Sequence, residues 1–164
     1  MKTETQMENT VRRPIRDAQA PPMIGGELTR SSSRTLVPTA VVYCEGNFAK
    51  IDGKTANGLV RHSEAYEIVS IIDSTHGGQN SGQVLDNTIN TIPILKDLDA
   101  AVAHATAKLN TFIYGMAPST GRLSPADRRI VLDAIARGMN IVSGRHEYLS
   151  DDIEIAQAAF ERQD

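Results

Sequence analysis

Residues 39–60 hold the side chains whose types and spacing point most directly to chemistry. The apolar run TAVVY leads into a loop with two glycines, Gly46 and Gly53. Lys54 and Thr55 then open an amphipathic helix. A helix N-terminus behind a glycine loop favours an anion, because backbone N–H groups and the positive end of the helix dipole face it. The stretch therefore predicts a site for a phosphate or carboxylate, to which Lys54 would add a full charge, but it defines no reaction.

The loop fits neither standard phosphate motif. A P-loop places four residues between its first glycine and the Gly-Lys pair, and here six separate Gly46 from Gly53. The dinucleotide motif G-x-G-x-x-G fails because Phe48 stands where its second glycine belongs. Asp73 ends the next apolar run, 27 positions after Gly46, whereas a ribose-binding acid usually follows by about 20. The long loop could absorb that difference, and the alternative is that Asp73 caps a loop or helix; Lys54 has a similar alternative as an exposed lysine.

A second candidate segment, residues 116–122, follows the fourth expected strand with the sequence MAPSTGR. Pro118 and Gly121 flank two hydroxyl side chains, which is typical of a turn with exposed donors. Arg122 could pair with a carboxylate or phosphate through two parallel hydrogen bonds. A plain turn is the alternative. We include Pro118, Gly121 and Arg122 among the predicted ligand contacts.

His146 is the best candidate for a general acid or base, because an imidazole can transfer protons near neutral pH. It follows the fifth expected strand in the sequence SGRHE, and the alternative is a structural histidine bonded to loop carbonyls. His76 could reach the same ligand. No two histidines have metal-ligand spacing and Cys44 lacks a partner, so we predict no metal and treat Cys44 as a small buried hydrophobe.

The elements that would position these residues alternate between strand and helix. Apolar runs predict strands, and caps followed by amphipathic spacing predict helices, with the polar segment 76–83 as a loop. Strands are expected at 41–43, 67–72, 92–95, 111–115 and 140–143; helices are expected to begin at Lys54, Asp97, Ser124 and Asp151. This alternation predicts an α/β Rossmann-like fold, with a mainly parallel five-stranded sheet and flanking helices. In such sheets, ligands bind beyond the carboxyl ends of the strands.

Composition excludes several classes of function. The formal charge is −3 and aromatic residues make up 4% of the 164 residues, so neither phosphate contacts nor base stacking favours a nucleic-acid partner. No apolar run approaches the roughly 18 residues of a membrane helix, and we expect no membrane association. A lone cysteine fits a reducing compartment, and with no signal peptide evident the expected location is cytoplasmic.

The chain divides near residue 36. Residues 1–36 carry six Lys or Arg against four Asp or Glu, with scattered prolines and a serine triplet, and we expect a basic tail of little regular structure. Residues 37–164 carry eleven against sixteen, and form the predicted Rossmann-like domain. The tail is either a solvated linker or an arm that docks on its own domain or on a neighbouring subunit. We therefore expect a homo-oligomer with the tail at its interface.

Four sequence elements together carry a family resemblance: GKTANGL, DSTHGG, MAPSTGR and GRHEYLSDD. Over about residues 38–155 the chain resembles the N-terminal Rossmann-like domain of a bacterial and archaeal family of unknown function. Members of that family continue into a P-loop-type domain, and they include an N-acetyl-D-glutamate synthase. The resemblance places signature positions at Lys54, Thr55, Asp73, Pro118, Gly121, His146 and Glu147. It departs at Arg145, where an apolar residue is expected.

Three functions remain open at this stage. The first is a stand-alone module that binds a nucleotide, a dinucleotide, an acyl carrier or a small acidic metabolite. The second is a scaffold subunit that assembles through its tail. The third is a subunit of a split enzyme related to N-acetyl-D-glutamate synthase, with the P-loop domain on a separate partner chain, since the chain ends where that domain would begin. We rank them in this order.

Overall fold

The computed structural model describes residues 37–117, 122–143 and 152–162. Within these ranges, five strands form one parallel sheet in the order β3-β2-β1-β4-β5. Their bounds are β1 Thr39–Tyr43, β2 Glu67–Ile72, β3 Ile94–Leu95, β4 Thr111–Tyr114 and β5 Asn140–Ser143. The prediction of a Rossmann-like, parallel five-stranded sheet is confirmed. The predicted tail lies outside the described residues.

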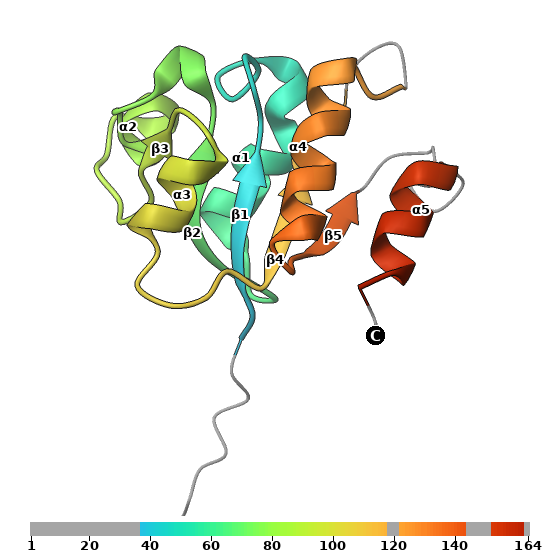
Figure 1. Ribbon diagram of the computed structural model, residues 1–164. Coiled ribbons are helices and arrows are strands. Elements are labelled where there is room, and N and C mark those ends of the chain that lie inside the picture. Colours follow the sequence, from blue (N-terminus) through green and yellow to red (C-terminus); the bar gives the residue numbers. More distant parts are fainter. Residues whose placement is uncertain (1–36, 118–121, 144–151, 163–164) are drawn as a thin grey trace, which may run out of the picture. The chain divides into compact units, whose positions relative to one another are not determined.

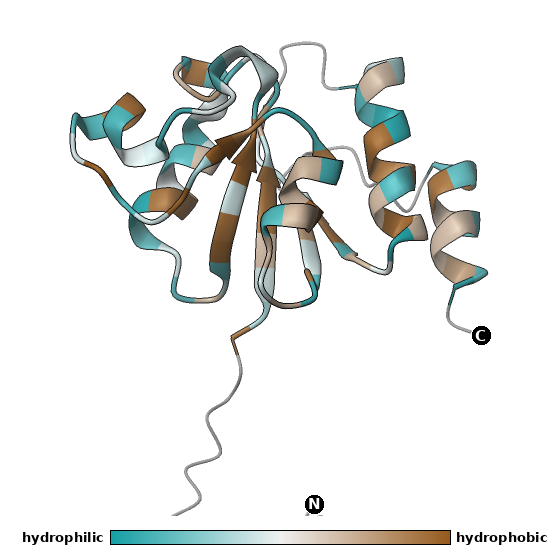
Figure 2. Ribbon diagram, turned by 60° about the vertical axis from the view of Figure 1, so that its left-hand side comes forward, coloured by the Kyte–Doolittle hydropathy of each residue, from teal (hydrophilic) through white to brown (hydrophobic). Residues whose placement is uncertain are grey.

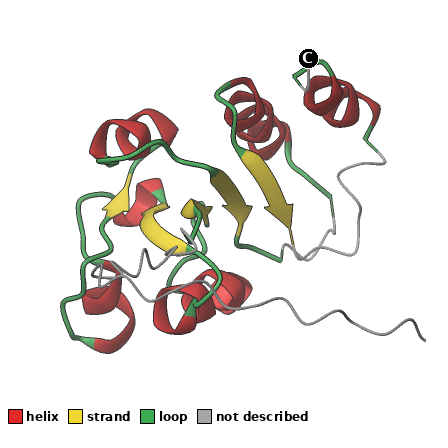
Figure 3. Cartoon of the chain, turned by 90° about the horizontal axis from the view of Figure 1, so that it is seen from below, coloured by secondary structure: helices red, strands yellow, loops and turns green. Residues whose placement is uncertain are grey.

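Helices cover both faces of the sheet (Figure 1). They are α1 Lys54–His62, α2 Ser81–Asp86, α3 Leu98–His104, α4 Pro125–Ala136 and α5 Ile153–Phe160. Viewed along the strands, α3 and α4 lie on one face and α1 and α2 on the other (Figure 3). Right-handed crossovers between parallel strands produce this arrangement, because the chain moves from β1 to β3 in one direction and returns to β4 and β5 in the other.

The core lies between the central strands and these helices, and it is mostly aliphatic. The central strands carry the most hydrophobic residues of the domain (Figure 2), and Val41, Val42 and Ile71 are fully buried. Strands that are buried on both faces appear in the sequence as continuous apolar runs, and these runs made the strands predictable. No helix in the described part of the chain is both long and apolar enough to cross a membrane.

Two predicted helix caps form as expected. The Asp97 side chain accepts a hydrogen bond from the Ala100 amide at 2.8 Å and begins α3. Ser124 and Asp127 form a capping box at the start of α4, with Pro125 in the first turn. Side-chain acceptors satisfy N–H groups that the helix itself leaves unpaired, so local sequence is enough to position these helix starts.

The structure differs from the sequence expectation at two elements. Part of the segment expected as a loop, residues 76–83, enters helix α2, whose N-cap Asn80 accepts from the Gly82 and Gln83 amides. A helix of six residues is too short to show amphipathic periodicity, so pattern reasoning missed it. In α3, amphipathic spacing predicts Leu98, Ala101 and Val102 on the buried face, but Val102 is 40% exposed and the short helix buries only the other two.

Candidate functional site

The strand order reverses between β1 and β4, and the N-terminus of α1 lies at that point. The Ala56 amide donates to the Gly115 carbonyl at 3.2 Å, and the Ala117 amide donates to the Asp52 carbonyl at 3.1 Å. These bonds join the loop and first turn of α1 to the segment that follows β4. In open α/β sheets a ligand crevice forms where the strand order reverses, beyond the carboxyl ends of the strands.

Asp73 organises the β1–α1 loop from the end of β2. Its carboxylate is fully buried and accepts from the Gly46 amide at 3.0 Å and the Phe48 amide at 3.3 Å. It also accepts from the Thr75 amide at 2.9 Å and hydroxyl at 2.6 Å, and its Oδ2 lies 3.0 Å from Nδ1 of His76. Asp73 thus caps the turn Ser74–His76 and fastens the loop after β1.

This arrangement changes the interpretation of the glycine loop. The amides of Gly46 and Phe48, expected to face a phosphate, face the Asp73 carboxylate instead. Burial by itself would raise the pKa of Asp73, but hydrogen bonds from Thr75, His76 and Gly46 outweigh burial and lower it. The loop therefore holds an anion that belongs to the protein, and the cap alternative for Asp73 has direct structural support.

Gly46 and Gly53 allow the backbone conformation of the same loop. Gly46 has a φ of +67°, a left-handed conformation that favours glycine. A Cβ atom at Gly53 would lie 2.3 Å from the Asn47 carbonyl oxygen, so only glycine allows this approach of the backbone to itself. Both glycines therefore serve the conformation of the loop, and the amide of Gly46 also donates to Asp73.

Lys54 and Thr55 are the predicted site residues whose side chains reach solvent in the first turn of α1. Arg122 is also exposed and follows the fourth strand, at the same edge of the sheet. The remaining predicted contacts, Pro118 and Gly121, lie outside the described residues, as do His146 and Glu147. Their proposed roles stay predictions.

Sequence reasoning missed a cluster of two tyrosines and one carboxylate near this edge. The hydroxyls of Tyr43 and Tyr114 donate to the two oxygens of Asp127 at 2.8 and 3.0 Å. Burial, followed by the bond to Asp127, raises the pKa of Tyr43 above its usual range. A tyrosine at the end of each of two neighbouring strands, with an acid in the first turn of a capped helix, was the available signal. The cluster joins α4 to β1 and β4.

Cys44 and the described acidic residues give no sign of metal or thiol chemistry. Cys44 is fully buried, and its pKa is raised to about 12 by burial and by the nearby carboxylates of Asp73 and Glu45. A thiol with a raised pKa is a poor nucleophile, as the sequence interpretation of a small hydrophobe implies. Within the described ranges, no group of three or more His, Cys, Asp or Glu side chains could hold a metal ion.

Strand order, crossovers and the loop at the reversal point define a Rossmann-like domain. The chain belongs to the family described as "Domain of unknown function (DUF1611_N) Rossmann-like domain", which matches residues 74–164. Among solved structures it is similar to a DUF1611 family protein from Anabaena variabilis ATCC 29413, with 26% identity and a TM-score of 0.65 over 74% of this chain. The match spans 33% of that protein, so the present chain corresponds to about a third of it.

A second solved structure gives a weaker match. Biliverdin reductase from Synechocystis sp. PCC 6803, crystallised with biliverdin and NADP+, has 14% identity and a TM-score of 0.46, over 77% of this chain and 35% of that one. None of the curated proteins compared with the chain matches it. The family is thus shown, while a second P-loop-type domain and a link to N-acetyl-D-glutamate synthase remain predictions.

Proposed function

We propose that this domain binds a small anionic ligand at the reversal point between β1 and β4. The observation that carries the proposal is the attachment of the first turn of α1 to the end of β4, through the Ala56 and Gly115 bond of 3.2 Å. This attachment fixes the positive end of a nine-residue helix at the edge where Rossmann-like sheets bind ligands.

Within the proposal, the site residues divide into two groups. Lys54 and Thr55 contact the ligand, since their side chains are exposed at the start of α1, and Arg122 adds charge from the segment after β4. Gly46, Gly53 and Asp73 maintain the loop that presents them. Pro118, Gly121 and His146 complete the site from the segments after β4 and β5, as the sequence predicts.

The ligand classes are those that a helix N-terminus and a lysine can recognise: a nucleotide or dinucleotide, an acyl carrier with its phosphates, or a small acidic metabolite. Each offers a phosphate or carboxylate of a size that one sheet edge can hold. Lys54 makes no ion pair with the residues that the structure describes, so its charge is left for the ligand.

A second candidate function is a subunit of a split enzyme related to N-acetyl-D-glutamate synthase. The observation that favours it is the length of the Anabaena relative, of which the matched segment is only 33%. In this proposal a separate P-loop-type chain supplies the other half of the enzyme, and His146 transfers the proton.

Binding can be tested by calorimetry with ATP, NADP+, coenzyme A and N-acetylglutamate as probes. We expect at least one probe to bind, and Lys54→Ala to weaken its binding by about tenfold, equivalent to about 1.4 kcal/mol. Lys108→Ala is the matched control, because it removes the same charge from an exposed lysine just before the start of β4, at the opposite edge of the sheet.

Two results would count against the site. If none of the four probes binds, the proposed binding function loses its support. If Lys54→Ala and Lys108→Ala weaken binding equally, the ligand responds to overall charge rather than to the start of α1, and the site lies elsewhere.

A further inference from the structure

The imidazole of His76 lies against a buried carboxylate. His76 ends the turn Ser74–His76 that follows β2, and its Nδ1 is 3.0 Å from Oδ2 of Asp73. The Asp73 side chain is fully buried, whereas that of His76 is 24% exposed. The other described histidines, His62 and His104, are exposed on α1 and α3 and lack such a partner. His76 is therefore held from the interior of the domain and still reaches solvent.

The two neighbours of Nδ1 determine which ring nitrogen carries the proton. The pKa of Asp73 is lowered, so its carboxylate is ionised at neutral pH and can only accept. The Thr75 hydroxyl lies 3.0 Å from Nδ1, but it donates its hydrogen to Oδ1 of Asp73 at 2.6 Å. Nδ1 must therefore be the donor. In a neutral imidazole with its proton on Nδ1, the lone pair is on Nε2, which bonds to no group within the described ranges.

The surroundings of His76 leave this lone pair accessible. Glu45, a second carboxylate near the turn, accepts from the amide of Ser74 at 2.9 Å and from its hydroxyl, so it does not compete for the ring. Gly77 and Gly78 follow His76 and have no side chain to cover it. At Gly78 even a Cβ atom would meet nothing within 4 Å.

Asp73 also connects His76 to the predicted ligand edge. The same carboxylate accepts from the amides of Gly46 and Phe48, so His76 borders the loop that leads into α1. The turn follows the carboxyl end of β2, and ligands of parallel sheets bind beyond the carboxyl ends of the strands.

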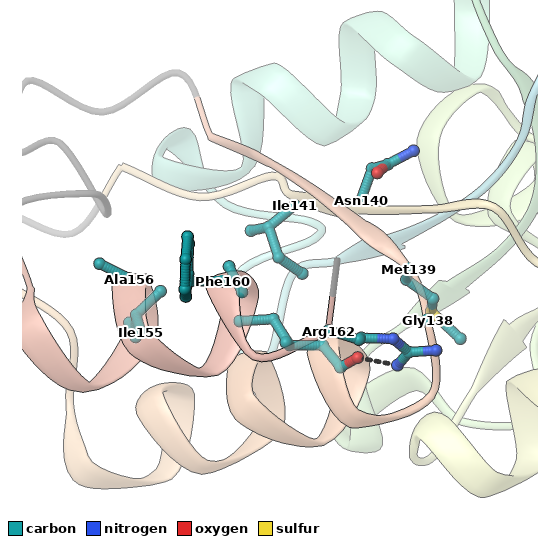
Figure 4. A pocket seen from close by; sticks show the side chains of 10 residues that line it. Gly138, Met139, Asn140, Ile141, Ile155, Ala156, Phe160 and Arg162 are labelled. Atoms are coloured by element: carbon teal, nitrogen blue, oxygen red, sulfur yellow. Dashed lines mark hydrogen bonds between the residues drawn. The ribbon is translucent and has the colours of Figure 1, made fainter. Parts of the chain in front are cut away.

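The groove between α5 and β5 offers no comparable group. It is a cavity of about 570 Å³, lined mainly by apolar side chains such as Ile141 and Phe160 (Figure 4). Arg162, the charged residue of its described lining, donates to the Ile135 carbonyl. Because an arginine stays protonated in proteins, no described side chain of this groove could take up a proton near neutral pH.

We propose that His76 is a proton-accepting residue, whose Nε2 takes the proton from a hydroxyl or thiol group of a ligand, and that Asp73 positions the ring. The oxygen or sulfur atom keeps the electron pair of the broken bond and becomes a nucleophile. The charge of the resulting imidazolium lies against the Asp73 carboxylate, which stabilises it. The ligand is the one that the proposed function places at this edge, whereas the state of the ring belongs to the chain alone.

The first measurement needs no variant. Long-range proton–nitrogen correlation NMR of the nitrogen-15-labelled full chain, at about pH 8.5 where imidazole rings are neutral, shows which nitrogen is protonated in each histidine. We expect the proton of His76 on Nδ1. His62 and His104 are internal references and should show the tautomer mixture of imidazoles without a partner.

The second measurement is the rate of modification by diethylpyrocarbonate, which uses the same lone pair. Nε2 forms a bond to a carbonyl carbon of the reagent as ethyl carbonate leaves, positive charge develops on the ring, and the Nδ1 proton then passes to water. Peptide mass spectrometry gives the rate at each histidine. We expect His76 to react faster than the more exposed His62 and His104, and Asp73→Asn to slow His76 by about tenfold without slowing the other two.

Two controls accompany these rates. Ser74→Ala removes the bonds of the same turn to Glu45 and should leave the rate at His76 unchanged, and circular dichroism shows that each variant is folded. A probe that binds in calorimetry should protect His76, but not His62, from the reagent. If no probe binds, only the binding function is contradicted, because the tautomer and the rate are measured on the chain alone.

Three results would overturn the proposal: a proton on Nε2 of neutral His76, a rate at His76 no higher than at His62 and His104, or a bound probe that leaves the rate at His76 unchanged. A folded Asp73→Asn variant with an unchanged rate would remove the positioning role of Asp73. If that variant does not fold, the tautomer of the wild type decides between the two nitrogens.

Discussion

The two sides of the sheet differ in how completely their aromatic side chains are buried. Beside β2 and β1, the loop after β1 is fastened by Asp73, and Phe48 in that loop is fully buried. Beside β5, an open groove separates the strand from α5, and Phe160 is 70% exposed. On the first side, loop amides satisfy the Asp73 carboxylate and Phe48 is buried, whereas on the second side Phe160 stays mostly exposed beside the groove.

This difference follows from where each side obtains its contacts. The loop after β1 closes on a residue of the next strand, so its stability is internal to the domain. Helix α5 is held by ion pairs from Arg128 and by its packing on α4. Partly exposed ion pairs such as Arg128–Asp152 contribute little, so the second side should respond weakly to changes that are severe on the first.

The sharpest test of the comparison uses the two phenylalanines. Phe48→Ala should lower the free energy of unfolding by about 3 to 5 kcal/mol, because it empties a fully buried site. Phe160→Ala, with most of the side chain already in water, should change it by about 0.5 kcal/mol or less. Urea denaturation measures both. Equal losses would show that the groove is closed in solution.

A smaller but still large effect is expected at Asp73. Asp73→Asn keeps the shape of the side chain but replaces an acceptor for several buried donors, and should cost about 3 kcal/mol at pH 7. Asp86→Asn, which breaks an exposed pair with Arg61, is the control and should leave the denaturation midpoint unchanged within error.

The pH dependence of the Asp73→Asn effect carries a definite sign. The pKa of Asp73 is lowered in the folded protein, so its stabilising contribution is complete above the unfolded pKa of about 3.9. As the pH falls below that value and through the folded pKa, the contribution is lost. The difference between wild type and variant should therefore shrink below about pH 4; a constant difference down to pH 2 would contradict the role of the charge.

The contrast between the two sides of the sheet also shows which features could be predicted from the sequence. Apolar runs predicted all five strands, and Ser124 with Pro125 predicted the start of α4, because these signals are local. Two partners of Asp73 are not local: the amides of Gly46 and Phe48 belong to a loop whose path no periodicity reveals. The strand, glycine loop and helix pattern of residues 39–60 therefore predicted the place of the loop correctly, but it did not predict which anion the loop amides bind.

The open groove was equally beyond a sequence prediction. The apolar residues of α5 suggest a buried helix face, and only the placement of α5 shows that Phe160 and Ile153 remain exposed. A pattern of apolar residues says that a surface needs covering. It does not say whether this chain or another one covers it.

Two glycines of the first side give a third, intermediate test. Gly53→Ala should cost about 2 kcal/mol, because its Cβ would meet the Asn47 carbonyl. Gly58→Ala, five residues later inside α1, meets nothing within 4 Å and should stabilise the protein by about 0.5 to 1 kcal/mol. Thermal unfolding of the two variants measures whether each is less or more stable than the wild type. A stabilising Gly53→Ala would show that the loop is looser than its hydrogen bonds imply.

The smallest global effect, and the most local, is expected at Arg128 on the open side. Its guanidinium bonds Asp152 and Glu154 at the start of α5, and Arg128→Met removes these pairs while keeping the length of the side chain. Because α5 has few other attachments, its amides should exchange faster while those of α1 and β1 are unchanged. Arg129→Met, one position along the same helix at an exposed arginine, should leave amide exchange in α5 unchanged.

Salt at about 0.5 M should have the same effect on the wild type as the Arg128 variant, since it screens the same ion pairs. If neither salt nor the variant accelerates exchange in α5, packing on α4 rather than charge holds that helix beside the groove.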